Sequence, residues 1–298
     1  MSQQRTSPSR GADSPEVTGF YEPDTGSVQY VVSDPASKQA AIIDAVWNFD
    51  PHNARTSTEP ADEILAYVRA RGLTVEWIFD THPHADHFMA AAYLKEKLGA
   101  PQAIGDKVRA IAELWRGLYH LPQAFDLAAA FDRLFADGDT FKLGALDVRV
   151  MLSPGHTLAS ITYIVGGDAA FVHDTLMQPD SGTSRADFPG GDAAQLYRSI
   201  KAILALPAQT RLFVGHDYCH GGRAPDWEST IAEQKATNSH VKDGISQAEF
   251  VRLRTERDKT LPLPDRMLHA LQVNLRGGRL PEPESDGHSY FKIPANRF

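Results

Sequence analysis

Residues 81–87 have the sequence Thr-His-Pro-His-Ala-Asp-His and are the most informative part of this chain. Side chains of an extended segment alternate between two faces, so His82 and His84 point the same way and Asp86 points alongside them. Two imidazoles on one side can hold a metal ion between them, and His87, opening a helix expected over 88–98, adds a fourth donor. This density of donors predicts a metal site. The alternative interpretation is a polar loop in which Asp86 caps that helix.

Short apolar runs separated by turn residues surround this segment and predict both strands and helices. The first strands are expected to be antiparallel, and strand 74–80 leads directly into the histidine cluster. Polar residues that directly follow strands indicate sheets sandwiched by helices, an α/β (α+β) fold. The expected strands cover residues 17–21, 27–32, 40–46, 74–80, 140–143, 146–152, 161–165, 169–172 and 211–214. The expected helices cover residues 60–71, 88–98, 106–119, 193–206, 227–237, 247–259 and 265–275.

Composition excludes several classes of protein. Among the 298 residues, no apolar run approaches the roughly 20 residues that a membrane helix needs. A net charge of −8 without clustered Lys and Arg argues against nucleic acid as a partner. Cys219 is the only cysteine, which excludes an internal disulfide and, without an apolar signal segment at the start, fits the cytoplasm. We expect residues 1–15 to be a disordered tail and residues 16–298 to form one domain with a short helical and Pro-rich C-terminal extension.

Three further metal-competent residues follow apolar strands. They are His156 in Ser-Pro-Gly-His-Thr, Asp174 in Val-His-Asp-Thr-Leu and His216 in Val-Gly-His-Asp-Tyr. Loops at strand ends commonly carry functional residues, and Gly155 and Gly215 allow the backbone to approach an ion closely. Each residue taken alone is more typical of a hydrogen-bonded turn, so the prediction of a site depends on their combination.

In order and spacing, these motifs resemble the ligand motifs of the metallo-β-lactamase superfamily. The resemblance covers residues from about 21 to 240 and implies an αββα sandwich, with two mixed sheets face to face and helices outside. It implies that His82, His84 and His156 form one metal site and that Asp86, His87 and His216 form a second. Asp174 would bridge the two.

Within the superfamily, the chain most resembles the persulfide dioxygenases and the bacterial β-lactamase-hydrolase-like proteins, through residues 81–87, 153–157, 185–188 and 215–218. This resemblance implies one Fe²⁺ per chain, held by His82, His156 and Asp174, with the remaining donors orienting those ligands. Two imidazoles and one carboxylate leave three positions open for a substrate sulfur and O₂. The implied reaction oxidises glutathione persulfide to sulfite and releases glutathione.

The same resemblance assigns two residues to the substrate. Arg185 would pair with a glutathione carboxylate, and the Tyr218 hydroxyl would lie near the iron. The ordinary alternatives are a surface ion pair for Arg185 and a half-buried tyrosine with a solvated hydroxyl for Tyr218.

The chain departs from the family pattern in two places. Residues 184–188 are Ser-Arg-Ala-Asp-Phe where the family has Gly-Arg-Thr-Asp-Phe, a change that bears on the substrate loop. His173 stands where a small residue is expected; we predict that it packs at the strand end and points away from the site, with a metal role as the alternative. Cys219 is expected to be inert, and reaction with a persulfide is its alternative role.

Two other functions stay open. All ligand types for two Zn²⁺ ions per chain are present, so a binuclear hydrolase of the glyoxalase II-like thioester type is the strongest alternative. A non-catalytic metal-binding sensor of sulfur or redox state is the second. A β-lactamase is less favoured because no export signal is found, and a nuclease because the chain is acidic. The predicted partners are a small thiol or persulfide and O₂; the oligomeric state stays open, with a homodimer as one alternative.

Overall fold

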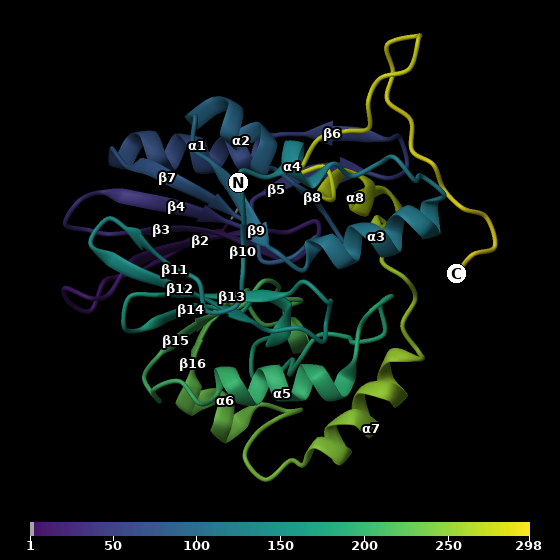
Figure 1. Ribbon diagram of the computed structural model, residues 1–298. Coiled ribbons are helices and arrows are strands. Elements are labelled where there is room, and N and C mark those ends of the chain that lie inside the picture. The colour runs from purple at the N-terminus through teal and green to yellow at the C-terminus, as the bar shows by residue number, and fades with distance from the viewer. Residues whose placement is uncertain (1–2) are drawn as a thin grey trace.

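The computed structural model describes residues 3–298 and contains strands and helices in alternation (Figure 1). The strands are β1 (Gln3–Ser7), β2 (Glu16–Glu22), β3 (Ser27–Ser33), β4 (Gln39–Ile43), β5 (Val46–Asp50), β6 (Arg55–Ser57), β7 (Thr74–Phe79), β8 (Phe88–Met89), β9 (Gln102–Gly105), β10 (Arg133–Phe135), β11 (Thr140–Leu143), β12 (Leu146–Leu152), β13 (Ile161–Val165), β14 (Ala169–Phe171), β15 (Arg211–Phe213) and β16 (Glu228–Thr230). The helices are α1 (Glu59–Arg71), α2 (Ala91–Leu98), α3 (Val108–Tyr119), α4 (Leu127–Ala130), α5 (Ala193–Ile203), α6 (Ile231–Thr237), α7 (Gln247–Asp258) and α8 (Met267–Asn274), with short 3₁₀ helices η1 (His173–Thr175) and η2 (His220–Gly222).

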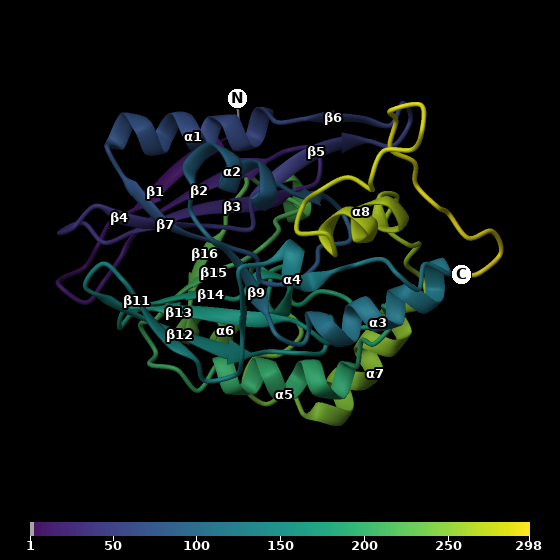
Figure 2. The same cartoon turned by 45° about the horizontal axis from the view of Figure 1, so that its top comes forward.

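Two sheets face each other, and helices cover their outer sides, as predicted. The first sheet has the strand order β1-β2-β3-β4-β7-β9-β10 and the second β11-β12-β13-β14-β15-β16. Helices α1 and α2 cover the first sheet, while α5 and α6 cover the second (Figures 1 and 2). The ring centroid of Tyr30 in the first sheet lies 5.3 Å from that of Phe171 in the second, and the stacked rings of Phe79 and Tyr163 have centroids 4.7 Å apart. These rings belong to the apolar core between the sheets, together with many Val, Ile, Leu and Ala side chains.

Both sheets are mixed. Strands β2 to β4 pair antiparallel, as predicted, and β1, which was not predicted, pairs antiparallel with β2, whereas β7 pairs parallel with β4 and β9. In the second sheet, β14 and β15 are parallel and their other neighbours antiparallel. The loops after β7, β12, β14 and β15 carry the predicted metal ligands and meet at one edge of the sandwich, so the topology itself assembles the site.

Two predicted helices begin later than expected because short strands precede them. Residues 88–89 form β8, which pairs with β5, and α2 starts at Ala91. His87 therefore does not open a helix. Residues 228–230 likewise form β16, which pairs with β15 before α6 starts. In both places, pairing with a distant strand determines the local structure, which a helical pattern in the sequence does not reveal.

The prediction of a disordered tail over residues 1–15 is wrong for the described part, residues 3–15. Strand β1 pairs with β2 along its whole length. The fully buried Arg211 holds the following segment: its guanidinium donates hydrogen bonds to the Ser7 and Ser14 hydroxyls, the Pro8 and Pro15 carbonyls and the Asp168 carboxylate. The segment is polar and lacks an alternation of apolar and polar residues, because its partner is a buried cation rather than an apolar core.

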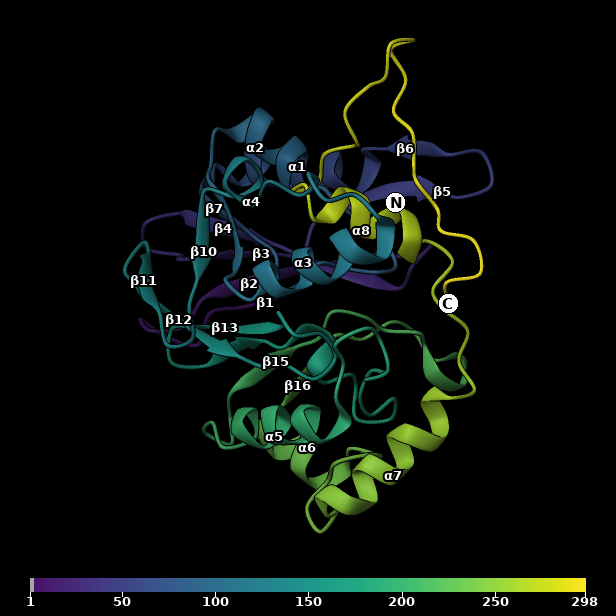
Figure 3. The same cartoon turned by 45° about the vertical axis from the view of Figure 1, so that its right-hand side comes forward.

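The C-terminal region crosses from one half of the sandwich to the other. Helix α7 lies beside the second sheet with α5, and residues 259–266 run from it to α8 in the opposite half (Figure 3). Beyond α8 the chain has no helix or strand, and Phe291 packs against Phe49 and Phe88. Among residues 3–298, no helix is both long and apolar enough to span a bilayer.

Candidate metal centre

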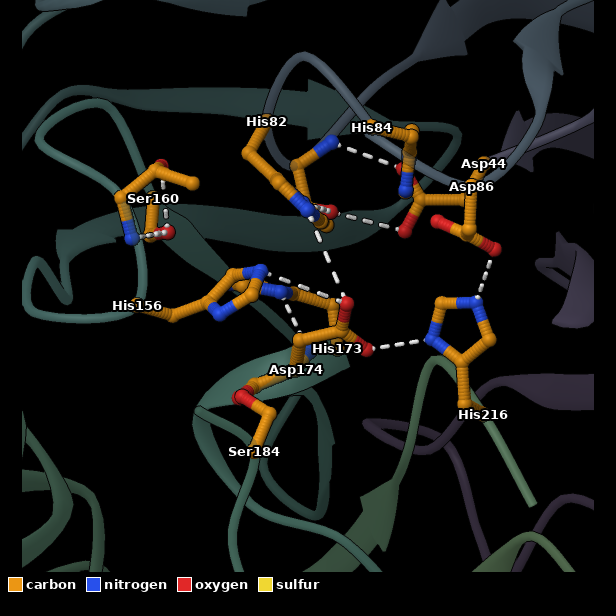
Figure 4. Close-up of polar contacts among 12 residues, drawn as sticks. Asp44, His82, His84, Asp86, His156, Ser160, His173, Asp174, Ser184 and His216 are labelled. Atoms are coloured by element: carbon orange, nitrogen blue, oxygen red, sulfur yellow. Dashed lines mark hydrogen bonds and ion pairs between the residues drawn. The ribbon is translucent and has the colours of Figure 1, made fainter. Parts of the chain in front are cut away.

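The structure brings the three residues predicted to hold iron around one carboxylate oxygen (Figure 4). His82 follows β7, His156 follows β12, and Asp174 lies on η1 after β14. The Nε2 atoms of His82 and His156 lie 3.7 and 3.6 Å from Asp174 Oδ2. A metal bound at about 2.1 Å separates its ligand atoms by about 3.0 to 3.4 Å, so a small inward shift of these three side chains would suit an ion.

Hydrogen bonds from the other side of each ring leave the Nε2 atoms free to ligate. His156 Nδ1 donates to the Arg185 carbonyl at 2.8 Å, and His82 Nδ1 lies 3.1 Å from the Thr81 hydroxyl. His82 Nε2 is buried and has no hydrogen-bond partner. An unpartnered buried nitrogen is costly unless a ligand satisfies it, so these residues fit a metal ion.

A second group of donors lies beside the first. His84 Nε2 contacts Asp44 Oδ1 at 3.1 Å, and His87 Nδ1 contacts Asp86 Oδ2 at 3.2 Å. Their opposite nitrogens, His84 Nδ1 and His87 Nε2, are buried without partners. One ligand atom from each of His84, Asp86 and His87 lies within 4.8 Å of the others. The structure thus groups His84 with Asp86 and His87, whereas the superfamily resemblance had grouped it with His82 and His156.

His216 connects the two groups through both ring nitrogens. Nδ1 lies 2.5 Å from Asp174 Oδ1, and Nε2 lies 2.7 Å from Asp86 Oδ2. Burial opposes a charge on His216, but the carboxylates of Asp174 and Asp86 outweigh it and raise the pKa of the imidazole well above its ordinary value. Each ring nitrogen of His216 thus has a carboxylate partner, and Nε2 also lies 3.0 Å from the Ser27 hydroxyl.

Asp44 is a site residue that the sequence analysis missed. Its Oδ1 accepts the Thr81 backbone N–H and its Oδ2 accepts the Thr81 hydroxyl, both at 2.8 Å, in addition to the contact with His84. The carboxylate therefore fixes the start of the histidine segment. The available signal was the acidic residue that directly follows the apolar run at residues 40–43. Its partners lie far along the chain, so the pattern alone did not identify its role.

His173 does not point away from the site, so that prediction is wrong. Its ring centroid lies 4.5 Å from that of His82. Nδ1 accepts the Asp174 backbone N–H, and Nε2 lies 3.3 Å from the Thr175 hydroxyl. The backbone has φ +36°, a conformation that favours glycine and explains why a small residue was expected. A ligand atom of His173 lies within 4.8 Å of one from His82 and one from Asp174, so the imidazole belongs to the metal-competent side chains, as in its alternative role.

The glycines beside the site have different roles. A Cβ on Gly215 would lie 2.9 Å from Asp174 Oδ1, so Gly215 permits close approach to the site as expected. A Cβ on Gly155 would lie 2.2 Å from the Leu196 backbone nitrogen, and φ is +133°. Gly155 therefore lets the His156 turn pack against α5, rather than letting the backbone approach an ion.

The residues predicted to contact substrate differ in availability. Tyr218 is 63% exposed and its ring stacks on His216 at 5.7 Å. Arg185 makes a bidentate pair with Asp187 at 2.6 and 2.8 Å, and it also donates to the Pro262 carbonyl at 2.6 Å. The Arg185 side chain is thus already occupied by protein partners, as in the ion-pair alternative. Cys219 is partly buried, with its sulfur 3.5 Å from the Tyr21 hydroxyl.

A cavity of about 710 Å³ opens onto the metal-facing side chains. Its walls include His156, Asp174 and Tyr218, and apolar side chains from Met177 and Phe188. A second hollow, of about 900 Å³, shares Asp86 and Tyr218 with it. The first cavity is large enough for a small peptide-like substrate.

Comparisons with known proteins identify the family of the chain. Residues 23–216 match the model of the metallo-β-lactamase superfamily. A β-lactamase hydrolase-like protein of Xylella fastidiosa is 58% identical over 95% of this chain and 65% of its own length. Glyoxylase B2 of Dictyostelium discoideum is 42% identical (94% and 97% covered), and the human mitochondrial persulfide dioxygenase ETHE1 is 27% identical (87% of each). The crystal structure of ETHE1 from Myxococcus xanthus superposes with a TM-score of 0.70 at 29% identity, covering 88% of this chain and 98% of that one.

The chain spans about two thirds of the length of the first of these relatives. The family match covers the segment that holds every predicted metal ligand, from His82 to His216. The fold, the ligand order and the clustered histidines and aspartates lead to the same assignment. This chain belongs to the metallo-β-lactamase superfamily.

Proposed function

We propose that the chain is an iron-dependent persulfide dioxygenase. The observation that supports this most is that the Nε2 atoms of His82 and His156 lie 3.7 and 3.6 Å from one carboxylate oxygen of Asp174, while both nitrogens of His216 contact carboxylates. Two imidazoles and one carboxylate are the donor set typical of non-haem Fe²⁺ oxygenases. The superfamily contains metal-dependent hydrolases as well, so the reaction is the part that we propose.

The proposed reaction converts glutathione persulfide, O₂ and water into glutathione, sulfite and two protons. A bound Fe²⁺ supplies adjacent open positions and the redox chemistry that joins oxygen to sulfur. The protein keeps His156 in the required orientation through its hydrogen bond to the Arg185 carbonyl. His216 links Asp174 and Asp86 through its two ring nitrogens, and the Tyr218 hydroxyl, at the cavity wall, would donate to the substrate sulfur.

The test is oxygen consumption by iron-reconstituted protein given glutathione persulfide, with metal content measured on the same sample. About one iron per chain, with oxygen uptake and sulfite formed, is the expected result. The Asp174→Ala variant is expected to lose both iron and oxygen uptake. If that variant kept both, the ligand assignment would be wrong.

A binuclear zinc hydrolase is the second candidate. The buried, unpartnered nitrogens of His84 and His87 beside Asp86 favour it, and so does the similarity to Glyoxylase B2. In that case His84, Asp86 and His87 would hold one of two Zn²⁺ ions, and the metals would supply a nucleophilic hydroxide for hydrolysis of a glutathione thioester. Two zinc ions per chain and thioester hydrolysis without oxygen uptake would identify this function. Bound metal without turnover of either substrate would contradict both candidates and favour the sensor.

A further inference from the structure

The 710 Å³ cavity has a second group of lining residues that the metal chemistry does not use. Ser239 and His240 come from the loop after α6, and Arg254 and Arg257 from α7. This group is basic, whereas the metal-facing side of the cavity contains Asp86 and Asp174. One cavity therefore offers a metal centre and a separate set of cationic and hydrogen-bonding groups.

Most charges that line this cavity are already paired. Arg185 binds Asp187, and Arg254 binds Asp258 within α7. Asp180 receives two hydrogen bonds from Arg223. Across residues 3–298, the exposed Arg257 guanidinium has neither an ion pair nor a hydrogen bond to the protein. Asp265, on the segment between α7 and α8, is the other lining charge without a protein partner in that range.

Arg254 adds a buried donor to this group. It is 1% exposed, and its two terminal nitrogens donate to the Thr183 carbonyl and to Asp258. The remaining nitrogen, Nε, is buried without a partner. Arg254 therefore adds a fixed positive charge behind the wall of the cavity, held in place by Thr183 and Asp258.

His240 offers a donor of known direction. Its Nδ1 accepts the Thr183 backbone N–H at 3.0 Å, so the ring hydrogen of the neutral imidazole lies on Nε2. Gly182 makes room for the ring, because a Cβ there would lie 2.2 Å from His240 Nδ1. The backbone around Gly182 therefore fixes the position of the His240 ring. Among residues 3–298, the His240 Nε2–H has no protein acceptor.

We propose that Arg257 and His240, supported by Arg254, form the subsite that binds a carboxylate of the thiol carrier. A guanidinium with free donors and an imidazole N–H are suited to a carboxylate, and Asp265 suits the ammonium of an amino-acid end. This inference rests on the proposed function for the sulfur chemistry and assigns carrier recognition to α7. It replaces Arg185, whose donors are taken by Asp187 and Pro262.

The test measures binding of glutathione to the full chain by calorimetry under anaerobic conditions, so that no turnover is required. Arg257→Ala is expected to weaken binding about tenfold, the usual effect of losing one charge-assisted pair. Arg252→Ala is the matched control, because Arg252 lies on the same helix, is 70% exposed and pairs with Glu256 outside the cavity. N-acetylcysteamine, a thiol without a carboxylate, is expected to bind the wild type and Arg257→Ala equally.

Three results would overturn the subsite: wild-type protein that does not bind glutathione, Arg257→Ala that binds it as tightly as the wild type, or equal loss of binding for N-acetylcysteamine. The outcome is independent of the reaction. Arg257-dependent binding of glutathione without oxygen uptake would contradict the dioxygenase but support the subsite. Oxygen uptake by the wild type, together with an unchanged affinity of Arg257→Ala for glutathione, would support the dioxygenase but contradict the subsite.

Discussion

Replacing Asp44 by asparagine should weaken metal binding far more than it weakens the fold. Asp44 Oδ2 accepts the Thr81 hydroxyl hydrogen, and that hydroxyl oxygen lies 3.1 Å from His82 Nδ1. Because the hydroxyl hydrogen is committed to Asp44, the oxygen accepts from His82 Nδ1–H. The proton of His82 is thus held on Nδ1, which leaves Nε2 unprotonated and ready to bind a metal.

Asparagine has the same shape but presents an NH₂ group where Oδ2 stood. The Thr81 hydroxyl can turn to accept from this group, and it then donates to His82 Nδ1, which moves the ring proton to Nε2. We expect metal affinity to fall about 10- to 100-fold, as for other residues that orient metal ligands. All hydrogen bonds still have partners, so the free energy of unfolding should fall by only about 2 kcal/mol, the difference between charged and neutral hydrogen bonds.

The assay is titration of the metal-free protein with Co²⁺, followed by absorbance, beside urea unfolding of the same samples. Asp34→Asn is the matched control: this buried carboxylate also accepts from a hydroxyl, that of Ser37, and from backbone N–H groups, but it contacts none of the histidines. Its replacement should leave metal affinity within about threefold, because no metal ligand depends on it. If Asp44→Asn also stayed within that range, the proton relay through Thr81 would be refuted.

Three further predictions concern the fold around the site. Arg211→Met should lower the free energy of unfolding by about 3 to 5 kcal/mol and speed hydrogen exchange in β1, because it leaves buried acceptors unpaired. Gly155→Ala should reduce the metal content of purified protein, since its Cβ would meet Leu196 N at 2.2 Å, whereas Gly138→Ala, which meets nothing within 4 Å, should not. Burial lowers the pKa of the His240 imidazole from 6.5 to about 4, so on acidification the unfolded state binds a proton before the folded state does. This difference favours unfolding, and the urea concentration at the unfolding midpoint should fall as the pH drops from about 6.5 to 4. The fall should be less steep in His240→Gln, which lacks the titrating group.

The sequence predicted the parts of the structure that depend on local patterns. Strands with apolar runs, the helix at residues 59–71 with its proline at the start and Gly72 at its end, and the ligands after strand ends all have signals within a few residues. The superfamily resemblance added the face-to-face arrangement of the sheets. The pairing of β14 with β15 then brings Asp174 and His216 together, although the two residues lie far apart in the chain.

The wrong predictions all concern residues whose partners are distant. Strand β1 looked disordered because the cation that holds the following residues, Arg211, lies far along the chain from them. The helix expected at residue 88 starts later because residues 88–89 pair with β5, and the Met89 backbone N–H also donates to Asn274. His173 was expected to point outward because its positive φ, and the close contact with His82 that follows, have no sequence pattern.

The number of metal ions is not determined by the number of donors, because an imidazole offers a metal only the nitrogen that the protein leaves free. His82, His84, His87 and His156 each have one nitrogen engaged by a hydroxyl, a carboxylate or a carbonyl and the other available. His216 has no available nitrogen, since Asp174 contacts Nδ1 and Asp86 contacts Nε2. A second ion would have to displace the proton that His216 shares with these carboxylates. Zinc binding at that position should therefore release a proton and strengthen as pH rises, whereas an ion held by His82, His156 and Asp174 needs no such exchange.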